Sequence, residues 1–473
     1  MSKVVIVGGG ISGLTIAYHL QKIAPAIEVR VLEQSNRLGG NVWTRREEGY
    51  QIECGPNGFL DTKASTLSLC SELGLTDRLI AASDQAGKNR YLALDEKLER
   101  FPTRLSDFFR SSLLSWRGKA RLAAELFCRC RKFADESVHD FIQRRAGREA
   151  AEVFGDALVT GIYAGDSALL SLPACFPRLR DLERHYGSVI RGMSRSRAPR
   201  SAGASSSREK STARGRMWSF REGMELLIDS IAEHIAGKTY CGVAVRRIER
   251  HESQVLRPAW TVAADGKDSW KADAVVLACP AHVQAAVIAE LDLELAERIG
   301  GIAYSAVAVV GLGYAGTDVP IDLNGFGFIV PQRTRRDLLG VQWCSSIFSE
   351  RAPPGAVLLR AMCGGWHRPE IAGWEDDRLL AALRLELKRL MGIDAVPRHV
   401  TIIRWDRAIP QYHMGHLDRV AWIEERAARH PGLFLAGNAY HGVALNDCTE
   451  RGLIDARRVK KYVESMDGNA DGG

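Results

Sequence analysis

The fold is decided by the opening stretch Lys3-Val-Val-Ile-Val-Gly8-Gly-Gly10-Ile-Ser-Gly13. Its apolar, β-branched segment before Gly8 predicts a short strand buried on both faces, as in parallel sheets. Helix-forming sequence follows to about Ile23, and the segment Glu28-Val-Arg-Val-Leu-Glu33 predicts a second strand. Because strand, glycine-rich turn, helix and strand follow in this order, we predict an α/β chain with a Rossmann-like dinucleotide-binding domain.

The residues of this turn have separate predicted roles. Gly8 permits a tight turn, Gly10 lets the backbone approach a pyrophosphate, and Gly13 lets the helix pack closely against the strand. The first helical N–H groups are free to bind phosphate oxygens. Glu33 follows Gly13 by twenty residues, where it can accept hydrogen bonds from a ribose 2′-hydroxyl, and its charge disfavours NADP. The predicted dinucleotide contacts are Gly8, Gly9, Gly10, Ile11, Ser12, Gly13 and Glu33. The alternative is a purely structural turn.

The residues after Glu33 favour FAD over NAD. The segment Gln34-Ser-Asn-Arg37-Leu-Gly39-Gly40 resembles the E-x-x-x-R-x-G-G extension of the FAD-dependent amine-oxidase superfamily. In that superfamily this loop wraps the cofactor, so the resemblance implies that Arg37 neutralises pyrophosphate charge. The segment Glu53-Cys-Gly-Pro-Asn-Gly58 resembles the next flavin-contacting turn. The implied contacts to non-covalent FAD are Gln34, Arg37, Gly39, Gly40, Gly55, Pro56, Asn57 and Gly58.

The C-terminal segment provides a second glycine-rich connection. Leu433-Phe-Leu-Ala-Gly437-Asn438 predicts a buried strand that ends in a turn, with a helix near residues 448–462. A ligand at the edge of a parallel sheet requires such a turn, although an ordinary strand-to-helix connection is the alternative. The superfamily also passes a mid-chain strand beside the adenine. These two features add Val243, Val245, Gly437, Asn438, Val443, Ala444 and Leu445 to the implied FAD contacts.

Between the N-terminal and C-terminal segments, the spacing of apolar residues predicts first helices and then strands. Apolar residues at spacings of three and four predict helices, and alternating apolar segments from residue 303 to 363 predict a second, mixed sheet. We predict an FAD-binding domain from residues 1–85, 217–295 and 400–473, a substrate-binding domain from 296–399 with 86–100, a helical membrane-associating domain from 101–193, and a disordered basic loop from 194–216.

Composition excludes several classes of protein. The 473 residues are 46% hydrophobic and 26% charged, unlike a disordered chain or a small disulfide-stapled scaffold. The ten cysteines are scattered without a Cys-x-x-Cys pair, which predicts reduced thiols and no structural zinc. His413 and His416 have no third ligand nearby, so we expect no metal site. We also expect no signal peptide, no membrane-spanning helix and a cytoplasmic location.

Five segments resemble protoporphyrinogen oxidases, and the resemblance covers nearly the whole chain. They are Phe154–Pro177, Asn89–Leu92, Gly325–Pro331, Ala408–His416 and Gly442–Cys448. The chain departs from the family pattern in the basic, Ser-rich stretch 194–216, which resembles an insertion, and at Asn438 and Leu445.

The resemblance implies a reaction and a pocket. The reaction is FAD-dependent oxidation of protoporphyrinogen IX to protoporphyrin IX, which removes six electrons in three flavin turnovers and converts dioxygen to hydrogen peroxide. Phe326, Ile329 and Met362 are implied to line an apolar slot for the macrocycle. Arg90 is implied to pair with a propionate, and the Gly161 backbone to approach the reacting carbon. No side-chain general base is expected.

Several alternatives remain open. Phe326, Ile329 and Met362 could be plain core, and Arg90 an ordinary surface cation. The sister substrate coproporphyrinogen III, with four propionates, is the first alternative reaction. An amine oxidase or carotenoid desaturase of the same fold is the second, and a flavin-free lipid-binding protein is a non-enzymatic third.

The net charge of +7 is localised. Residues 100–132 contain nine basic and two acidic residues, interleaved with apolar ones such as Phe109, Trp116 and Phe127. This pattern predicts peripheral binding to an anionic membrane, here the inner cell membrane, although a helix with a solvated basic face is the alternative. Residues 191–216 contribute another +7. No nucleic-acid motif is present. A homodimer, and handover of product to the next haem-pathway enzyme, remain open.

Overall fold

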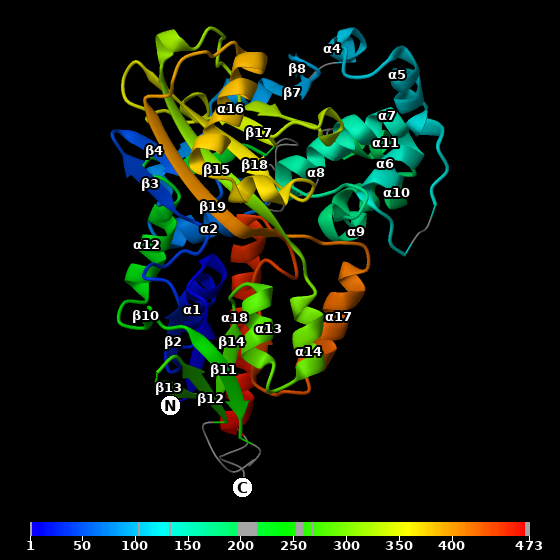
Figure 1. Ribbon diagram of the computed structural model, residues 1–473. Coiled ribbons are helices and arrows are strands. Elements are labelled where there is room, and N and C mark those ends of the chain that lie inside the picture. The colour runs from blue at the N-terminus through cyan, green and yellow to red at the C-terminus, as the bar shows by residue number, and fades with distance from the viewer. Residues whose placement is uncertain are drawn as a thin grey trace, which may run out of the picture.

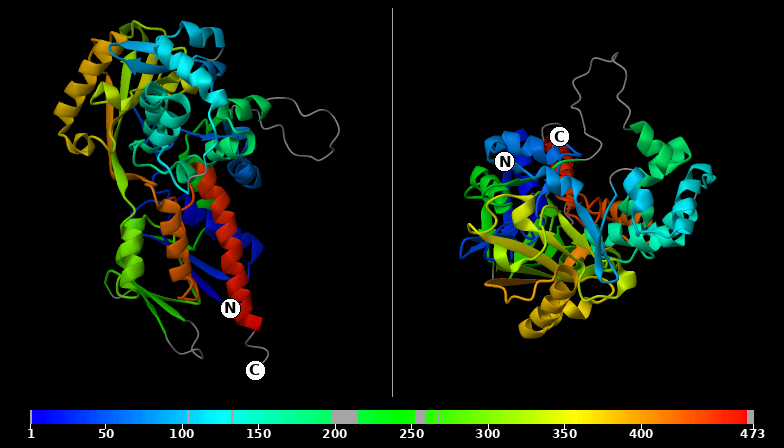
Figure 2. Two further views of the ribbon diagram at one scale, coloured as in Figure 1. Left: turned by 90° about the vertical axis from the view of Figure 1, so that its right-hand side faces the viewer. Right: turned by 90° about the horizontal axis from the view of Figure 1, so that it is seen from above.

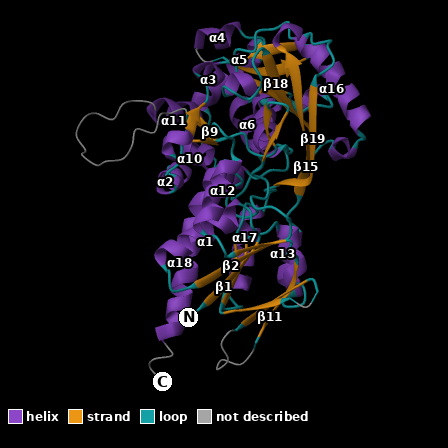
Figure 3. Cartoon of the chain, turned by 90° about the vertical axis from the view of Figure 1, so that its left-hand side faces the viewer, coloured by secondary structure: helices purple, strands orange, loops and turns teal. Residues whose placement is uncertain are grey.

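The computed structural model describes residues 2–102, 105–131, 134–196, 215–251, 259–266 and 268–468. These residues form two lobes, with a group of helices beside the upper lobe in Figure 1. The long strands β15 (Tyr304–Ala315) and β19 (His399–Pro410) lead from the upper lobe towards the lower one (Figure 3).

The lower lobe is built on a five-stranded parallel sheet. Its strands, in spatial order, are β10 (Thr239–Cys241), β2 (Glu28–Glu33), β1 (Lys3–Val7), β14 (Ala274–Leu277) and β20 (Leu433–Leu435). Residues Val4 to Val7 are at most 5% exposed, as expected for a central parallel strand. The predicted opening strand, turn, helix and strand are therefore confirmed, and strands from three distant parts of the chain share one sheet.

Helices cover one face of this sheet. They are α1 (Ile11–Ile23), α2 (Ser65–Glu72), α12 (Glu225–His234) and α18 (Leu445–Gly468). Their apolar side chains form one core with the sheet, which contains Ile16 of α1, Ile231 of α12 and Val459 of α18. The predicted helix near residues 448–462 is confirmed as part of α18.

The other face packs against a second layer. Its elements are β11 (Val245–Arg250), β12 (Trp260–Ala264), β13 (Ser269–Ala272), α13 (Ala281–Ile288), α14 (Leu293–Gly300) and α17 (His416–Ala427). The buried side chains of Trp260, Ile288 and Ile423 lie in the core between this layer and the sheet.

The upper lobe contains a seven-stranded mixed sheet. In spatial order its strands are β19, β15, β18 (Ala356–Gly364), β17 (Gly340–Trp343), β16 (Gly327–Ile329), β7 (Arg90–Leu94) and β8 (Lys97–Arg100). Only the β16–β7 pair is parallel among the pairs of this sheet. The predicted mixed sheet is confirmed. One boundary differs: we assigned residues 400–410 to the FAD-binding domain, but they pair with β15 along its length and form the edge of this sheet.

The two faces of the mixed sheet have different neighbours. The outer face packs against the apolar side of α16 (Asp376–Met391), through Leu383 and Leu387. The inner face carries Val307, Val309 and Met362 and is turned towards the parallel-sheet lobe. Smaller connecting elements are β3 (Thr44–Glu47), β4 (Tyr50–Glu53), β5 (Phe59–Leu60), β6 (Leu79–Ala81), β9 (Met217–Phe220), α3 (Asp84–Lys88) and α15 (Cys344–Ile347).

The helical region lies to one side of the upper lobe (Figures 1 and 2). Its helices are α4 (Leu105–Arg110), α5 (Trp116–Ala123), α6 (Val138–Ala146), α7 (Arg148–Ala150), α8 (Asp156–Tyr163), α9 (Leu172–Cys175), α10 (Pro177–Tyr186) and α11 (Val189–Ser196). The buried Arg145 guanidinium pairs with Glu125 and Glu183 at its centre. The predicted helices are confirmed, but α11 extends to Ser196, so the first residues of the predicted loop 194–216 are helical. Residues 197–214 lie outside the described residues.

Within the ranges that the structure describes, no helix combines the length and the apolar character needed to cross a bilayer.

Candidate functional site

A cavity of about 540 Å³ lies where the two lobes meet. Its lining comes from residues at the carboxyl ends of β1, β2 and β14 and from the inner face of the mixed sheet. The carboxyl edge of a parallel sheet is where α/β folds bind their ligands. Of the predicted FAD contacts, those that line the cavity are Gly8, Gly10, Ile11, Ser12, Glu33, Gln34, Arg37, Gly39, Gly40, Gly55, Pro56, Asn57, Val243, Val245, Gly437, Asn438, Val443 and Leu445.

The three glycines of the opening turn differ in their surroundings. Gly8 adopts φ +110°, and a Cβ atom on it would lie 2.7 Å from the backbone nitrogen of Cys279. A Cβ atom on Gly13 would collide with the carbonyl oxygen of Gly8. A Cβ atom on Gly10 would meet no described protein atom nearer than the Cα atom of Gly40, at 4.0 Å. Gly8 and Gly13 therefore permit close backbone packing, whereas Gly10 leaves space in the cavity.

Glu33 connects the turn to the end of β2. One carboxylate oxygen accepts a hydrogen bond from the Gly9 N–H at 2.7 Å, and the other accepts one from the Ser35 N–H at 2.8 Å. The side chain is buried and borders the cavity beside Val243. Glu33 thus fixes the glycine-rich turn and presents negative charge at the end of the cavity where we predict the ribose.

Arg37 is held by its own loop. Its guanidinium donates to the carbonyl oxygen of Gly40 at 2.6 Å and lies 4.5 Å from the ring centroid of Trp43. Gly39 and Gly40 have φ values of +101° and +56°, so this loop needs glycine in order to turn here. Arg37 therefore presents a fixed cation beside the glycine-rich turn.

Two buried donors that border the cavity have no hydrogen-bond partner among the described residues. They are the side-chain amide nitrogen of Asn57, a residue that is 5% exposed, and the Nε atom of Arg360, a residue that is 4% exposed. Buried donors are nearly always paired in folded proteins. They fit a bound group rich in hydrogen-bond acceptors, such as the ring system of a flavin.

Four predicted FAD contacts do not line the cavity. Gly9 packs against the side chains of Leu38 and Glu33, and Gly13 packs beneath Gly8. The remaining two are Gly58, where a Cβ atom would collide with the Trp218 carbonyl oxygen, and Ala444, whose N–H donates to the Asp447 carboxylate at 3.2 Å. These four residues shape the loops around the cavity without facing it.

The predicted substrate residues are only partly brought together. Gly161 and Met362 line the cavity. Ile329 lies directly behind Gly161, because a Cβ atom on Gly161 would be 2.8 Å from the Ile329 Cδ1 atom. Phe326 does not line the cavity, so the predicted slot of Phe326, Ile329 and Met362 does not form one wall. Phe326 precedes β16 and packs near Phe348, with the Arg90 guanidinium 4.9 Å from its ring centroid.

Several lining residues were missed from the sequence. The inner face of the mixed sheet contributes Val307, Val309, Gln342, Arg360 and Trp405. Val307 and Val309 follow the alternation expected of a strand, and Arg360 is the single charged residue in the otherwise apolar strand β18. These signals were present, but choosing the face that meets the cavity requires the pairing of distant strands.

The thiols at the cavity are buried, and burial favours their neutral form. Burial raises the pKa of Cys448 to about 11 and that of Cys54 and Cys279 to about 12, so each remains a neutral thiol near pH 7. The environment of Cys448 therefore suits a structural thiol rather than a thiolate.

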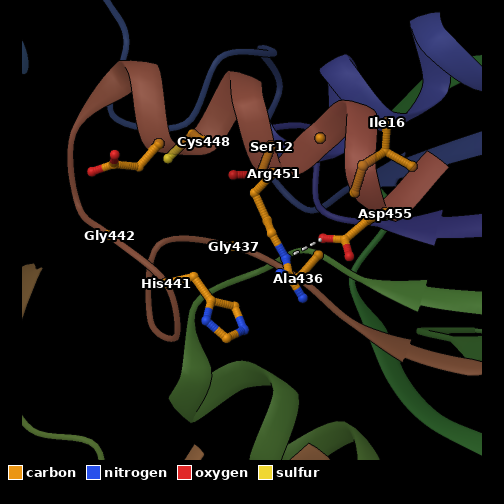
Figure 4. A pocket seen from close by; sticks show the side chains of 11 residues that line it. Ser12, Ile16, Ala436, Gly437, His441, Gly442, Cys448, Arg451 and Asp455 are labelled. Atoms are coloured by element: carbon orange, nitrogen blue, oxygen red, sulfur yellow. Dashed lines mark ion pairs between the residues drawn. The ribbon is translucent and has the colours of Figure 1, made fainter. Parts of the chain in front are cut away.

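A second, much smaller cavity of about 10 Å³ lies behind the C-terminal turn (Figure 4). Ser12 and Gly437 border both cavities, and the ion pair of Arg451 and Asp455 closes the far side at 3.3 Å. Its size suits about one water molecule.

A family model for flavin-containing amine oxidoreductases matches residues 11–460. The chain belongs to this family. The chain is 30% identical to coproporphyrinogen III oxidase of Bacillus subtilis, with 98% of each chain covered. It is 33% identical to protoporphyrinogen oxidase of Macaca fascicularis, over 95% of this chain and 96% of the relative. A crystal structure from Exiguobacterium sp. 255-15, provisionally named a protoporphyrinogen oxidase, matches with a TM-score of 0.82 and 26% identity, over 98% of this chain and 99% of its own.

The family and the fold establish a flavin oxidoreductase with FAD as its cofactor. The cavity suits that cofactor, because the glycine-rich turn, the loop of Arg37 and the unpaired Asn57 amide all line it. The assignment of individual residues to parts of FAD stays a prediction.

Proposed function

We propose that this flavin oxidoreductase oxidises protoporphyrinogen IX to protoporphyrin IX, with dioxygen as the final acceptor and hydrogen peroxide as the second product. The observation that carries the proposal is similarity over nearly the full length to porphyrinogen oxidases, at 30% to 33% identity. Bound FAD supplies the two-electron acceptor. Three oxidations of this kind take the reduced macrocycle to the aromatic porphyrin.

The residues that line the cavity suit this reaction, because they can position the substrate and exclude water from it. Gly161 leaves its backbone open towards the cavity, and the neighbouring wall carries Val307, Val309 and Met362. The soft Met362 side chain can adapt to a flat, apolar ring. Among the described lining residues at this end of the cavity there is no Asp, Glu or His. The geometry therefore supports a reaction without a side-chain general base.

The competing substrate is coproporphyrinogen III, which a relative of similar identity oxidises according to its name. The test is an aerobic assay of the purified holoprotein with each reduced porphyrinogen, followed by porphyrin fluorescence and peroxide production. A higher kcat/KM for protoporphyrinogen IX supports the proposal, and a higher value for coproporphyrinogen III replaces it with the sister reaction. Turnover of neither substrate overturns the assignment to porphyrinogens.

We also propose that the outer end of the helical region docks on an anionic membrane. Phe109, Trp116 and Phe127 are 50%, 72% and 86% exposed there. Not every basic residue of the stretch 100–132 takes part. Lys119 is buried and donates to the carbonyl oxygens of Phe109 and Ser111, and Arg121 donates to backbone carbonyl oxygens of α6. Docking of this kind suits a substrate that partitions into lipid.

A further inference from the structure

Arg360 is a charged residue on the inner face of the mixed sheet. Across that face, the register pairs Arg360 of β18 with Gln342 of β17, Gln342 with Gly327 of β16, and Gly327 with Arg90 of β7. Cross-strand partners point to the same side of a sheet. Arg360 therefore faces the cavity, which it lines, although it is only 4% exposed.

The contacts of Arg360 fix its guanidinium but do not neutralise it. One terminal nitrogen donates to the Gly55 carbonyl oxygen at 2.6 Å, and the other donates to the Gln342 side-chain oxygen at 2.9 Å. The Nε atom has no partner among the described residues, and no described carboxylate lies within 4.0 Å of the group. The nearby Glu53 is engaged instead with Arg351 and Thr44.

A buried cation of this kind is costly unless it meets an anion. Burial lowers the pKa of Arg360 from its ordinary value, but a guanidinium stays ionised in proteins. Leaving one charge uncompensated in the interior destabilises a protein by several kcal/mol. The negative charge is therefore expected from the occupant of the cavity.

We propose that Arg360 is a fixed counter-cation for negative charge on a group bound in the cavity. Two groups can carry that charge. The first is the flavin, because a hydride received by the oxidised ring brings two electrons and one proton and so adds one negative charge. The second is a carboxylate of the substrate, a source that rests on the proposed function.

Each source has structural support. Gly55 belongs to the turn that lines the cavity with Asn57, and its bond to Arg360 favours the flavin. Gln342 lines the cavity beside Arg360 and favours a carboxylate, because its side-chain amide can donate to an acid alongside the guanidinium.

The first experiment tests, without substrate, whether the flavin carries the negative charge that Arg360 meets. The midpoint potential of bound FAD is measured by dye-coupled spectroscopic titration in the wild type, Arg360→Met and Arg360→Lys. Loss of the charge should disfavour the reduced flavin at least tenfold, a fall of about 30 mV for a two-electron couple, whereas Arg360→Lys should stay near the wild type. Arg404→Met is the matched control, because Arg404 lies on the same sheet opposite Ala308, whose side chain belongs to the outer core.

The second experiment tests whether a substrate carboxylate carries the negative charge, and it measures binding rather than turnover. Fluorescence quenching compares the affinity of the oxidised holoprotein for a porphyrin free acid and for its methyl ester. If a carboxylate meets Arg360, the preference for the acid falls about tenfold in Arg360→Met while the flavin potential is unchanged. If neither the potential nor the preference changes, the proposal is overturned, whatever the substrate of the enzyme.

A folding defect is separated from these outcomes by flavin content and melting temperature. Should Arg360→Met fail to retain FAD, Arg360→Gln takes its place, because its amide can still donate to the Gly55 carbonyl oxygen.

Discussion

Gly10 is the residue at which we predict that the backbone approaches the pyrophosphate of FAD. The space beyond its Cα atom opens into the cavity, so the side chain of Gly10→Val should fill that space and abolish FAD binding. The purified variant should be colourless but folded, as judged by visible absorbance and circular dichroism. Gly373→Val is the control, since Gly373 is exposed and no described atom lies within 4 Å of its added Cβ. A yellow Gly10→Val protein with normal flavin content would refute the site.

Arg90 is predicted to act on the substrate and not on the cofactor. Arg90 is the first residue of β7, and its guanidinium lies over the ring of Phe326. A charge-assisted hydrogen bond to a carboxylate contributes about 1.5–3 kcal/mol, so Arg90→Ala should raise KM about tenfold or more at unchanged flavin content. Lys97→Ala, in the neighbouring strand β8, should leave KM unaltered. An unchanged KM in Arg90→Ala contradicts the anchor.

Residues whose roles depend on close neighbours in sequence could be predicted well. Gly13 acts within one strand–turn–helix unit, and the structure shows the tight packing against Gly8 that its sequence context implies. Phe326 and Arg360 depend instead on which strands pair and on which face meets the cavity. That information comes from the register between segments far apart in the chain, which periodicity alone does not contain.

At the scale of elements, helix α8 carries Gly161 and must be held against the mixed sheet. The Asp156 carboxylate at the start of α8 accepts a hydrogen bond from the Gln332 N–H, just after β16. Burial raises the pKa of Asp156 from 3.8 to about 6, although the hydrogen bond from the Gln332 N–H lowers it. The contact between α8 and the mixed sheet therefore contains a carboxylate whose ionisation destabilises the folded protein.

The effect on stability follows from the direction of the shift. Between pH 3.8 and about 6 the folded protein binds more protons at Asp156 than the unfolded chain does. Stability must therefore fall as the pH rises through this window, and the cost persists above it. Asp156→Asn removes the charge but keeps an oxygen that can accept from the Gln332 N–H. We expect this variant to be more stable at pH 8, by up to about 3 kcal/mol, and equal to the wild type near pH 4.

The measurement is urea unfolding at pH 4, 6 and 8. Glu425→Gln is the control, because Glu425 is an exposed carboxylate of α17 and its variant should show no comparable change. A stability difference for Asp156→Asn that is the same at pH 4 and pH 8 would show that ionisation is not its cause.

At the scale of the whole molecule, the cavity depends on bringing distant segments together. The glycine-rich turn lies near the start of the chain, Gly161 in the helical region, Met362 in the mixed sheet and Asn438 near the end, yet all four line one cavity. The order of local elements was predictable from apolar periodicity. The extent of β19 was not, because its membership in the mixed sheet is decided by pairing with β15.

The exposed apolar residues of the helical region predict how the whole protein binds to membranes. Trp116 and Phe127 project from the outer end of that region, and exposed arginines such as Arg129 and Arg131 accompany them. Each basic residue near an anionic surface contributes about 1 kcal/mol to binding. Wild-type protein should therefore sediment with phosphatidylserine vesicles at low salt and much less with phosphatidylcholine vesicles.

Variants then separate the apolar from the charged contribution, because the two respond differently to salt. The double variant Trp116→Ser/Phe127→Ser should weaken binding at every salt concentration, since it removes apolar area from the interface. The double variant Arg129→Gln/Arg131→Gln should weaken it mainly at low salt, where charges are poorly screened. Leu293→Ser is the control, because Leu293 is 64% exposed but belongs to α14 of the other lobe. Equal sedimentation of all these proteins would mean that the apolar end of the helical region serves another contact.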